Sequence, residues 1–328
     1  MQINTNPNDH SVTLDMSAKL LYEEAQNRGI TCTTFGDSQT ILMQKNEKQW
    51  YTIGARTSLQ SSVGRTIANQ KNLTKKILEY FKIPTAKFVE VKNVSALSQI
   101  AELSFPLVMK PVSGAHGDNV IVGIKSQQEA EKAFLAYKKP VLFEELLIGT
   151  EYRVVCIDYK FAAAAYRKPA HVTGDGVSTV ATLIDKKNQH PLRGVGHTSP
   201  LTKIIVDEQV LEYVAQQDSA LDHVPEKDQD IFLRRTANLS TGGEAYNVTD
   251  LVSPENRILF EKIARVCDLN TLGIDIMCTS LSKPIIEQSN AGVIEVNGSP
   301  GLRMHQYPLT GEPINLAKLI LDMVAAHI

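Results

Sequence analysis

The stretch GVIEVNGSPGLRMH, residues 292–305, combines an apolar β-strand with two polar side chains just before a turn. Side chains alternate between the two faces of a strand, so Ile294 and Val296 share one face while Glu295 and Asn297 share the other. A carboxylate in such an apolar strand is costly unless a partner binds it. The rest of the chain must therefore supply that partner.

A second strand-like segment, TLGIDIMC at 271–278, places Asp275 on one face and its isoleucines on the other. Either acid alone is explained by solvent or a paired lysine. Together, two carboxylates and one amide on neighbouring strands suit Mg²⁺, which binds oxygen ligands, water and substrate phosphates. We therefore predict that Asp275, Glu295 and Asn297 bind Mg²⁺, with Mn²⁺ able to substitute.

The composition is that of a globular protein, with 328 residues, 43% apolar, 21% charged and a net charge of −2. This balance does not favour a nucleic-acid or membrane partner. No apolar run approaches the roughly 20 residues needed to span a bilayer. The first residues do not show the pattern of a secretory signal, so none is expected, and the four cysteines are isolated. We expect a cytoplasmic protein, and a homo-oligomer is compatible with the sequence.

Two further stretches carry unusual polar residues. FPLVMKPVSGAHGDNVIVGI, residues 105–124, has a strand that ends at Lys110, followed by a glycine-containing hairpin that is suited to a phosphate or is a simple turn. PVLFEELLIGTEYRV, residues 140–154, carries two adjacent acids in an apolar strand, which is typical of an edge strand or of a strand facing hydrogen-bond donors. NLTKKILEYF, residues 72–81, predicts a helix.

Nine stretches occur in the order found in one known family. They are ARTSLQSS, NQKNLTKKIL, VMKPVSGAHGDNV, VLFEELLIGTEYRVV, YRKPAHVTGDGVSTVATLI, NQHPLRGVGH, RRTANLSTGGEAYNVTD, GIDIM and IEVNGSPGLRMHQYP. Together they resemble the ATP-grasp ligases, in particular the ATP-grasp portions of cyanophycin synthetase and of bifunctional glutathione synthetase. The resemblance runs from about residue 17 to the end of the chain.

This resemblance implies an α+β fold in which two lobes clamp ATP, with Mg²⁺ on the phosphates. We expect a short N-terminal α/β segment at 1–70, a small lobe at 71–147 and a large lobe at 148–328 that holds the metal and acceptor sites.

The resemblance also implies which residues bind ATP. Two lysines contact phosphates, the 113–120 hairpin closes over them, a hinge reads adenine largely through its backbone, and an acid after the hinge binds the ribose. The residues expected in these roles are Lys71, Lys110, Ser113, Gly114, His116, Gly117, Glu144, Glu145, Leu146, Leu147 and Glu151.

The remaining expected roles concern the reaction. The resemblance implies that Arg167 is catalytic by facing the phosphates. Arg303 is expected to be catalytic by holding a substrate carboxylate in two parallel bonds, and the alternative is an arginine solvated on the turn. The residues expected at the substrates are Arg153, Asn238, Ser240, Thr241, Gly242 and Arg303. The loop histidines His171, His190 and His197 are expected to be solvated.

The implied enzyme is an ADP-forming acid–amino-acid ligase that forms a C–N bond through an acyl phosphate and acts on small amino-acid or peptide substrates. A glutathione-synthetase-like reaction, γ-glutamylcysteine plus glycine, is the first expectation. The alternatives are a cyanophycin-synthetase-like or short-peptide ligase and, outside the enzymes, an ATP-binding module without turnover.

Overall fold

The computed structural model describes residues 14–35, 38–113, 119–196 and 199–328. The chain divides into two compact units, and neither is one continuous stretch. Unit 1 comprises Met1–Leu59, Ala163–Thr249 and Gly301–Ile328, and unit 2 comprises Gln60–Ala162 and Asp250–Pro300. The expected segments at 1–70, 71–147 and 148–328 stay predictions. Each of the two units combines stretches that are separate in the sequence.

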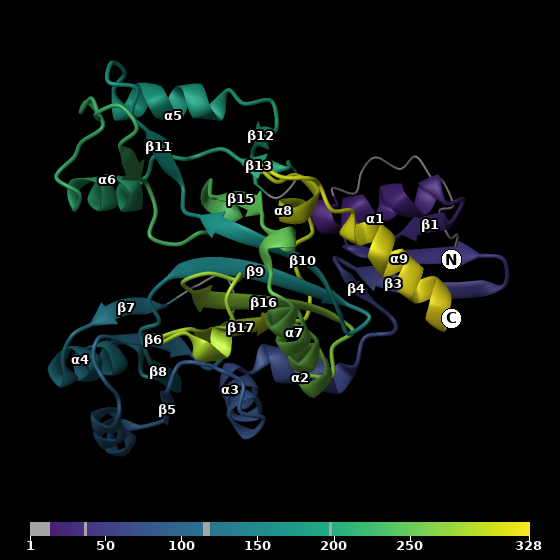
Figure 1. Ribbon diagram of the computed structural model, residues 1–328, viewed down its shortest axis with the longest axis horizontal. Helices are drawn as coiled ribbons and strands as arrows, with labels where there is room; N and C mark the ends of the chain where they lie inside the picture. Colours follow the sequence, from purple (N-terminus) through teal and green to yellow (C-terminus); the bar gives the residue numbers. More distant parts are fainter. Residues whose placement is uncertain (1–13, 36–37, 114–118, 197–198) are drawn as a thin grey trace. The chain divides into compact units, whose positions relative to one another are not determined.

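The first part of unit 1 is a small antiparallel sheet with two helices. The sheet has the order β1-β2-β3-β4, and α1 and α9 lie side by side (Figure 1). The Asp15 carboxylate caps α1 by accepting from the backbone N–H groups of Ser17 and Ala18, at 2.8 and 2.9 Å. The elements are α1 (Met16–Asn27), β1 (Thr31–Thr34), β2 (Thr40–Lys45), β3 (Lys48–Ile53), β4 (Arg56–Thr57) and α9 (Leu316–His327).

The second part of unit 1 is built around short strand pairs. β10 pairs with β15 and β11 with β14, both antiparallel, whereas β12 and β13 are parallel. Apolar residues of β11, β14, α5 and α6 form one buried cluster. The elements are β10 (Lys160–Lys168), β11 (His171–Thr173), α5 (Val180–Asn188), β12 (Arg193–Gly194), β13 (Leu201–Thr202), α6 (Glu208–Ala215), β14 (Asp230–Phe232), η2 (Leu239–Thr241), β15 (Glu244–Asn247) and α8 (Arg303–Gln306).

Unit 2 contains an antiparallel sheet of order β5-β8-β6-β7. Its core includes Met109, Phe143 and Phe134 of α4, so the helical layer covers the sheet's apolar face (Figure 1). The elements are β5 (Phe88–Val91), η1 (Val94–Glu102), β6 (Leu107–Pro111), β7 (Ile121–Ile124), α4 (Gln127–Tyr137) and β8 (Val141–Glu145).

The other strands of unit 2 are three antiparallel neighbours, β9-β16-β17. Helices α2, α3 and α7 pack against these strands (Figure 1). Gly64 of α2 has no room for a side chain, because a Cβ there would lie 2.0 Å from the Asp268 carbonyl oxygen. The elements are α2 (Ser62–Asn69), α3 (Lys71–Tyr80), β9 (Thr150–Ile157), η3 (Thr249–Leu251), α7 (Pro254–Val266), β16 (Thr271–Cys278), η4 (Ile285–Glu287) and β17 (Gly292–Asn297).

Both units mix helices with mainly antiparallel strands. In the parts of the chain that the structure describes, no helix is both long and apolar enough to cross a bilayer.

Candidate active site

The two expected metal carboxylates lie directly opposite each other in unit 2. Asp275 of β16 and Glu295 of β17 are register partners, and Gly273 is paired with Asn297. Opposed residues of an antiparallel pair share a face, so all three oxygen-bearing side chains project from one face of the sheet. Asp275 is buried at 7% exposure, whereas the Glu295 side chain is 31% exposed. The structure therefore brings the three together, and their role as metal ligands stays a prediction.

Each carboxylate also has a basic partner. Arg153 of β9 is the register partner of Asp275, and its guanidinium donates to both carboxylate oxygens, with Nη2 3.0 Å from Oδ2. Burial lowers the pKa of Arg153, but the adjacent Asp275 outweighs this and the pKa is raised. Lys71 Nζ lies 2.8 Å from Glu295 Oε1. The guanidinium of Arg153 is thus paired with Asp275, and its expected role at the substrate stays a prediction.

The donor set fits a hard divalent cation. A carboxylate that accepts two N–H groups still has lone pairs for a metal, and the Asn297 amide supplies a third oxygen. Among the described residues no group of three His, Cys, Asp or Glu side chains could hold a metal ion. A site with two carboxylates agrees with Mg²⁺, which keeps water and phosphate oxygens as its other ligands.

A buried charge cluster lies nearby in the same unit. Lys110 Nζ is 2.7 Å from Glu144 Oε1, and Lys75 Nζ is 2.8 Å from Glu144 Oε2. Lys110 and Glu144 come from the adjacent strands β6 and β8. Val108 is the register partner of Glu144, and Lys110, two residues further along β6, lies on the same face of the sheet. Burial raises the pKa of Glu144, but the two lysines outweigh it and the pKa is lowered.

Lys75 was not among the residues predicted from the sequence. The available signal was its position four residues after Lys71, which places both lysines on one side of α3.

In the hinge expected to bind adenine, several polar groups are already bonded to other residues of the protein. The carboxylate of Glu144 is buried between the two lysines, so it is not available to a base. The backbone N–H groups of Glu145 and Leu146 donate to Lys87 and Pro106 carbonyls at 2.9 and 3.0 Å. Within the described residues, the N–H of Leu147 has no such partner. Recognition of adenine by this hinge, and of ribose by Glu151 on β9, stays a prediction.

The expected phosphate hairpin is only partly visible. Ser113 is exposed two residues after the end of β6, and Gly114, His116 and Gly117 lie outside the described residues.

Unit 1 contains the other expected residues. Arg167 is buried on β10 opposite Ala245, and its role toward phosphate stays a prediction. Arg303 begins α8, is 7% exposed, and donates to the Ser199 carbonyl oxygen at 3.1 Å. The remaining expected substrate residues form a tight turn at η2, in which Gly242 has a φ of 96° and approaches Ile204 too closely for a Cβ. That turn comprises Asn238, Ser240, Thr241 and Gly242.

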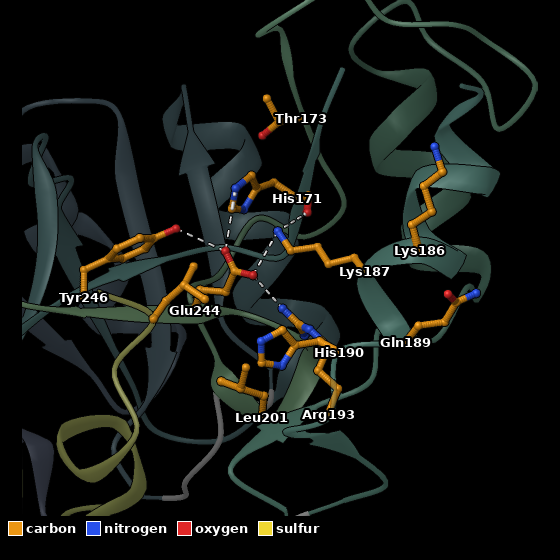
Figure 2. Close-up of a pocket in the computed structure, with 11 residues that line it drawn as sticks. His171, Thr173, Lys186, Lys187, Gln189, His190, Arg193, Leu201, Glu244 and Tyr246 are labelled. Atoms are coloured by element: carbon orange, nitrogen blue, oxygen red, sulfur yellow. Dashed lines mark hydrogen bonds and ion pairs between the residues drawn. The ribbon is translucent and has the colours of Figure 1, made fainter. Parts of the chain in front are cut away.

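A cavity of about 530 Å³ in unit 1 is lined by a buried carboxylate, Glu244, that was not among the predicted site residues. Figure 2 shows Glu244 at the centre of four side chains, with Arg193 at 2.6 Å, Lys187 at 2.9 Å, the Tyr246 hydroxyl at 3.1 Å and His171 Nε2 at 3.7 Å. Burial raises the pKa of Glu244, but these basic neighbours outweigh it and the pKa is lowered.

The expectation that His171 is a solvated loop residue is wrong. It is 4% exposed on β11, and its Nδ1 donates to the Pro169 carbonyl oxygen at 2.9 Å. Burial and the nearby Lys187 charge lower the pKa of His171. His190 lies at the wall of the same cavity, and His197 lies outside the described residues.

No family model matches the sequence. Cyanophycin synthetase from Synechocystis sp. is 35% identical over 329 residues, covering 92% of this chain and 38% of that protein. The glutathione biosynthesis bifunctional protein GshAB from Mannheimia succiniciproducens is 32% identical over 323 residues, covering 95% of this chain and 42% of that protein. The crystal structure of a bifunctional glutathione synthetase from Pasteurella multocida matches with a TM-score of 0.75 and 28% identity, over 96% of this chain and 44% of that one.

The chain belongs to the ATP-grasp family. The predicted α+β fold class of these ligases is thereby confirmed. This ATP-grasp chain spans less than half of the length of the relatives named here.

Arg303→Lys in this ATP-grasp chain is expected to raise the KM for the acid substrate about tenfold while leaving the KM for ATP nearly unchanged. Among the described residues, no carboxylate lies within ion-pairing distance of Arg303, so its guanidinium can hold a substrate carboxylate in two parallel bonds, whereas lysine cannot. Steady-state kinetics measure both values. Arg234→Lys is the control, because that buried arginine already pairs with Asp207 at 2.6 Å. Equal changes in both KM values would contradict the role of Arg303.

Proposed function

We propose that this chain joins a carboxylate to an amine with ATP as the energy source. The observation that carries the proposal is the set of opposed carboxylates, Asp275 and Glu295, with Lys71 bonded to Glu295. An acid pair with adjacent ammonium groups is suited to a nucleotide triphosphate and its divalent cation. The similarity to cyanophycin synthetase and to a bifunctional glutathione synthetase supports the same class of reaction.

The reaction would proceed in two steps. A carboxylate oxygen of the acid substrate attacks the γ-phosphorus, the bond to the bridging oxygen breaks, and ADP leaves. The amine then attacks the acyl carbon, the bond from that carbon to the phosphate oxygen breaks, and the nitrogen releases a proton, which forms the amide and free phosphate. Lys71 and Lys110 would stabilise negative charge on the phosphate oxygens. Asp275, Glu295 and Asn297 would hold Mg²⁺, which when bound neutralises further phosphate charge.

The substrates are proposed to be amino acids or short peptides. The resemblance in the sequence makes the glutathione-synthetase-like pair, γ-glutamylcysteine and glycine, the first expectation. The sequence identities favour the cyanophycin-synthetase-like alternative, since the cyanophycin synthetase is 35% identical and GshAB is 32% identical. Arg303 and the turn from Asn238 to Gly242 are the residues proposed to hold the acid substrate.

A panel assay tests the proposal. ADP release is measured with ATP and Mg²⁺ against γ-glutamylcysteine with glycine, cyanophycin with single amino acids, and dipeptides. Hydroxylamine replaces the amine in a parallel series, because it traps an acyl phosphate as a hydroxamate whatever the natural amine is. We expect ADP release that depends on one acid, and a product mass equal to the sum of acid and amine less water. Binding of ATP with no acid-dependent ADP or hydroxamate would indicate a module without turnover.

A further inference from the structure

Lys75 is a buried lysine that the proposed reaction does not use. Its side chain is 3% exposed, and its ammonium lies 2.8 Å from Glu144 Oε2. It also donates to Thr85 Oγ1 at 2.7 Å and to the Val293 carbonyl oxygen at 3.4 Å. Three acceptors match the three N–H donors of an ammonium group. The protein therefore satisfies Lys75 completely.

Lys110, on the other side of the same carboxylate, is not satisfied in this way. It lies 2.7 Å from Glu144 Oε1, and its other contact among the described residues is the Ile294 carbonyl oxygen at 3.4 Å. Its side chain is 8% exposed. At least one of its three N–H groups thus has no protein acceptor in the part of the chain that the structure describes.

The cluster has an excess of positive charge. Two ammonium groups and one carboxylate leave a net charge of +1, and all three side chains are at least nine-tenths buried. A buried charge without a counter-ion is costly. Because Lys75 is fully bonded, an incoming anion would be met by Lys110.

We propose that Lys75 is a positioning residue that neutralises Glu144 and so leaves the charge of Lys110 available to a phosphate oxygen of the nucleotide. The inference rests on the proposed function, which assigns Lys110 to ATP. Without the charge of Lys75, Glu144 would hold Lys110 in a neutral pair, and a phosphate would have to compete with that carboxylate.

This arrangement makes nucleotide binding depend on pH. The charged groups that face Lys75 are Glu144 of β8, Lys110 of β6 and Glu79 of its own helix. Burial lowers the pKa of Lys75 to about 8, against the opposing effect of Glu144. Below that pH the cluster has a net charge of +1. Above it Lys75 is neutral, so the charge of Lys110 is balanced by the charge of Glu144. ATP is already ionised throughout, since the second pKa of a phosphate is about 6.

The test is calorimetric binding of a non-hydrolysable ATP analogue with Mg²⁺ at pH 7 and pH 9.5. The unaltered chain should bind about tenfold more weakly at pH 9.5. Lys75→Met should bind about tenfold more weakly at pH 7 and show no further change at pH 9.5. Lys76→Met is the matched control, because it removes the same charge from the next residue of α3, where the side chain is 58% exposed and pairs with Glu90.

The outcomes separate the two proposals. Unaltered affinity in a folded Lys75→Met chain, together with equal affinity of the unaltered chain at both pH values, would overturn the role of Lys75 alone. The pH series on the unaltered chain gives this answer even where the variant fails to fold. No binding of the analogue at either pH would overturn the proposed function and the role of Lys75 together. The same loss of affinity in Lys76→Met would indicate a general charge effect and would also overturn the role of Lys75.

Discussion

Glu295→Gln is expected to remove most ATP turnover while leaving unit 2 folded. The variant keeps the size of the side chain but loses the charge that would hold Mg²⁺. Its structural cost is small, because the Glu295 side chain is 31% exposed and its ion pair with Lys71 is partly solvated. Such pairs contribute about 0–1 kcal/mol. The rate of ADP release at limiting Mg²⁺, with urea unfolding as the stability measurement, checks both parts.

Asp275→Asn provides the contrast. It should also lose turnover, but it should lower the free energy of unfolding by about 3–5 kcal/mol, because the buried guanidinium of Arg153 is left without its counter-charge. Near-normal turnover of Glu295→Gln at limiting Mg²⁺ would contradict the metal assignment. Equal stability of the two variants would contradict the buried pair with Arg153.

Local patterns in the sequence are sufficient to predict that Asp275, Glu295 and Asn297 project from one face of the sheet. Strand alternation alone places Glu295 and Asn297 on one face and Asp275 on the corresponding face of its own strand, and the register of β16 with β17 then brings them together. The helix predicted over 72–81 forms as α3, Lys71–Tyr80. These features depend on residues a few positions apart, which periodicity can detect.

The charged partners of the buried site residues could not be predicted from the sequence. Arg153 meets Asp275 across 122 positions of the chain. Lys75 is buried only because residues from three other segments surround its ammonium. His171 appeared to be a loop residue because its surroundings are rich in glycine, proline and charge, and its burial depends on Glu244 and Lys187. Long-range pairings of this kind leave no periodic signal.

Glu144→Gln is expected to be among the most destabilising single changes in unit 2, lowering the free energy of unfolding at pH 7 by about 3–5 kcal/mol. The carboxylate is 3% exposed and serves two buried ammonium groups, at 2.7 and 2.8 Å. Its removal leaves two buried lysines without their shared counter-charge, whereas glutamine can offer only one carbonyl oxygen as an acceptor. Urea unfolding of the variant and the unaltered chain measures the difference.

A double-mutant cycle separates this charge effect from a loss of packing. Lys75→Met in the Glu144→Gln chain should recover part of the stability, because it removes one of the two uncompensated charges, and the coupling between the two sites should exceed about 1 kcal/mol. Lys76→Met with Glu90→Gln is the matched cycle on the exposed pair of the same helix, where the coupling should stay below about 1 kcal/mol. Raising the pH to 9.5 should narrow the gap between Glu144→Gln and the unaltered chain, since Lys75 then loses its proton and no longer needs a counter-charge. A gap that is the same at both pH values, with no coupling to Lys75, would show that Glu144 acts by packing and not by its charge.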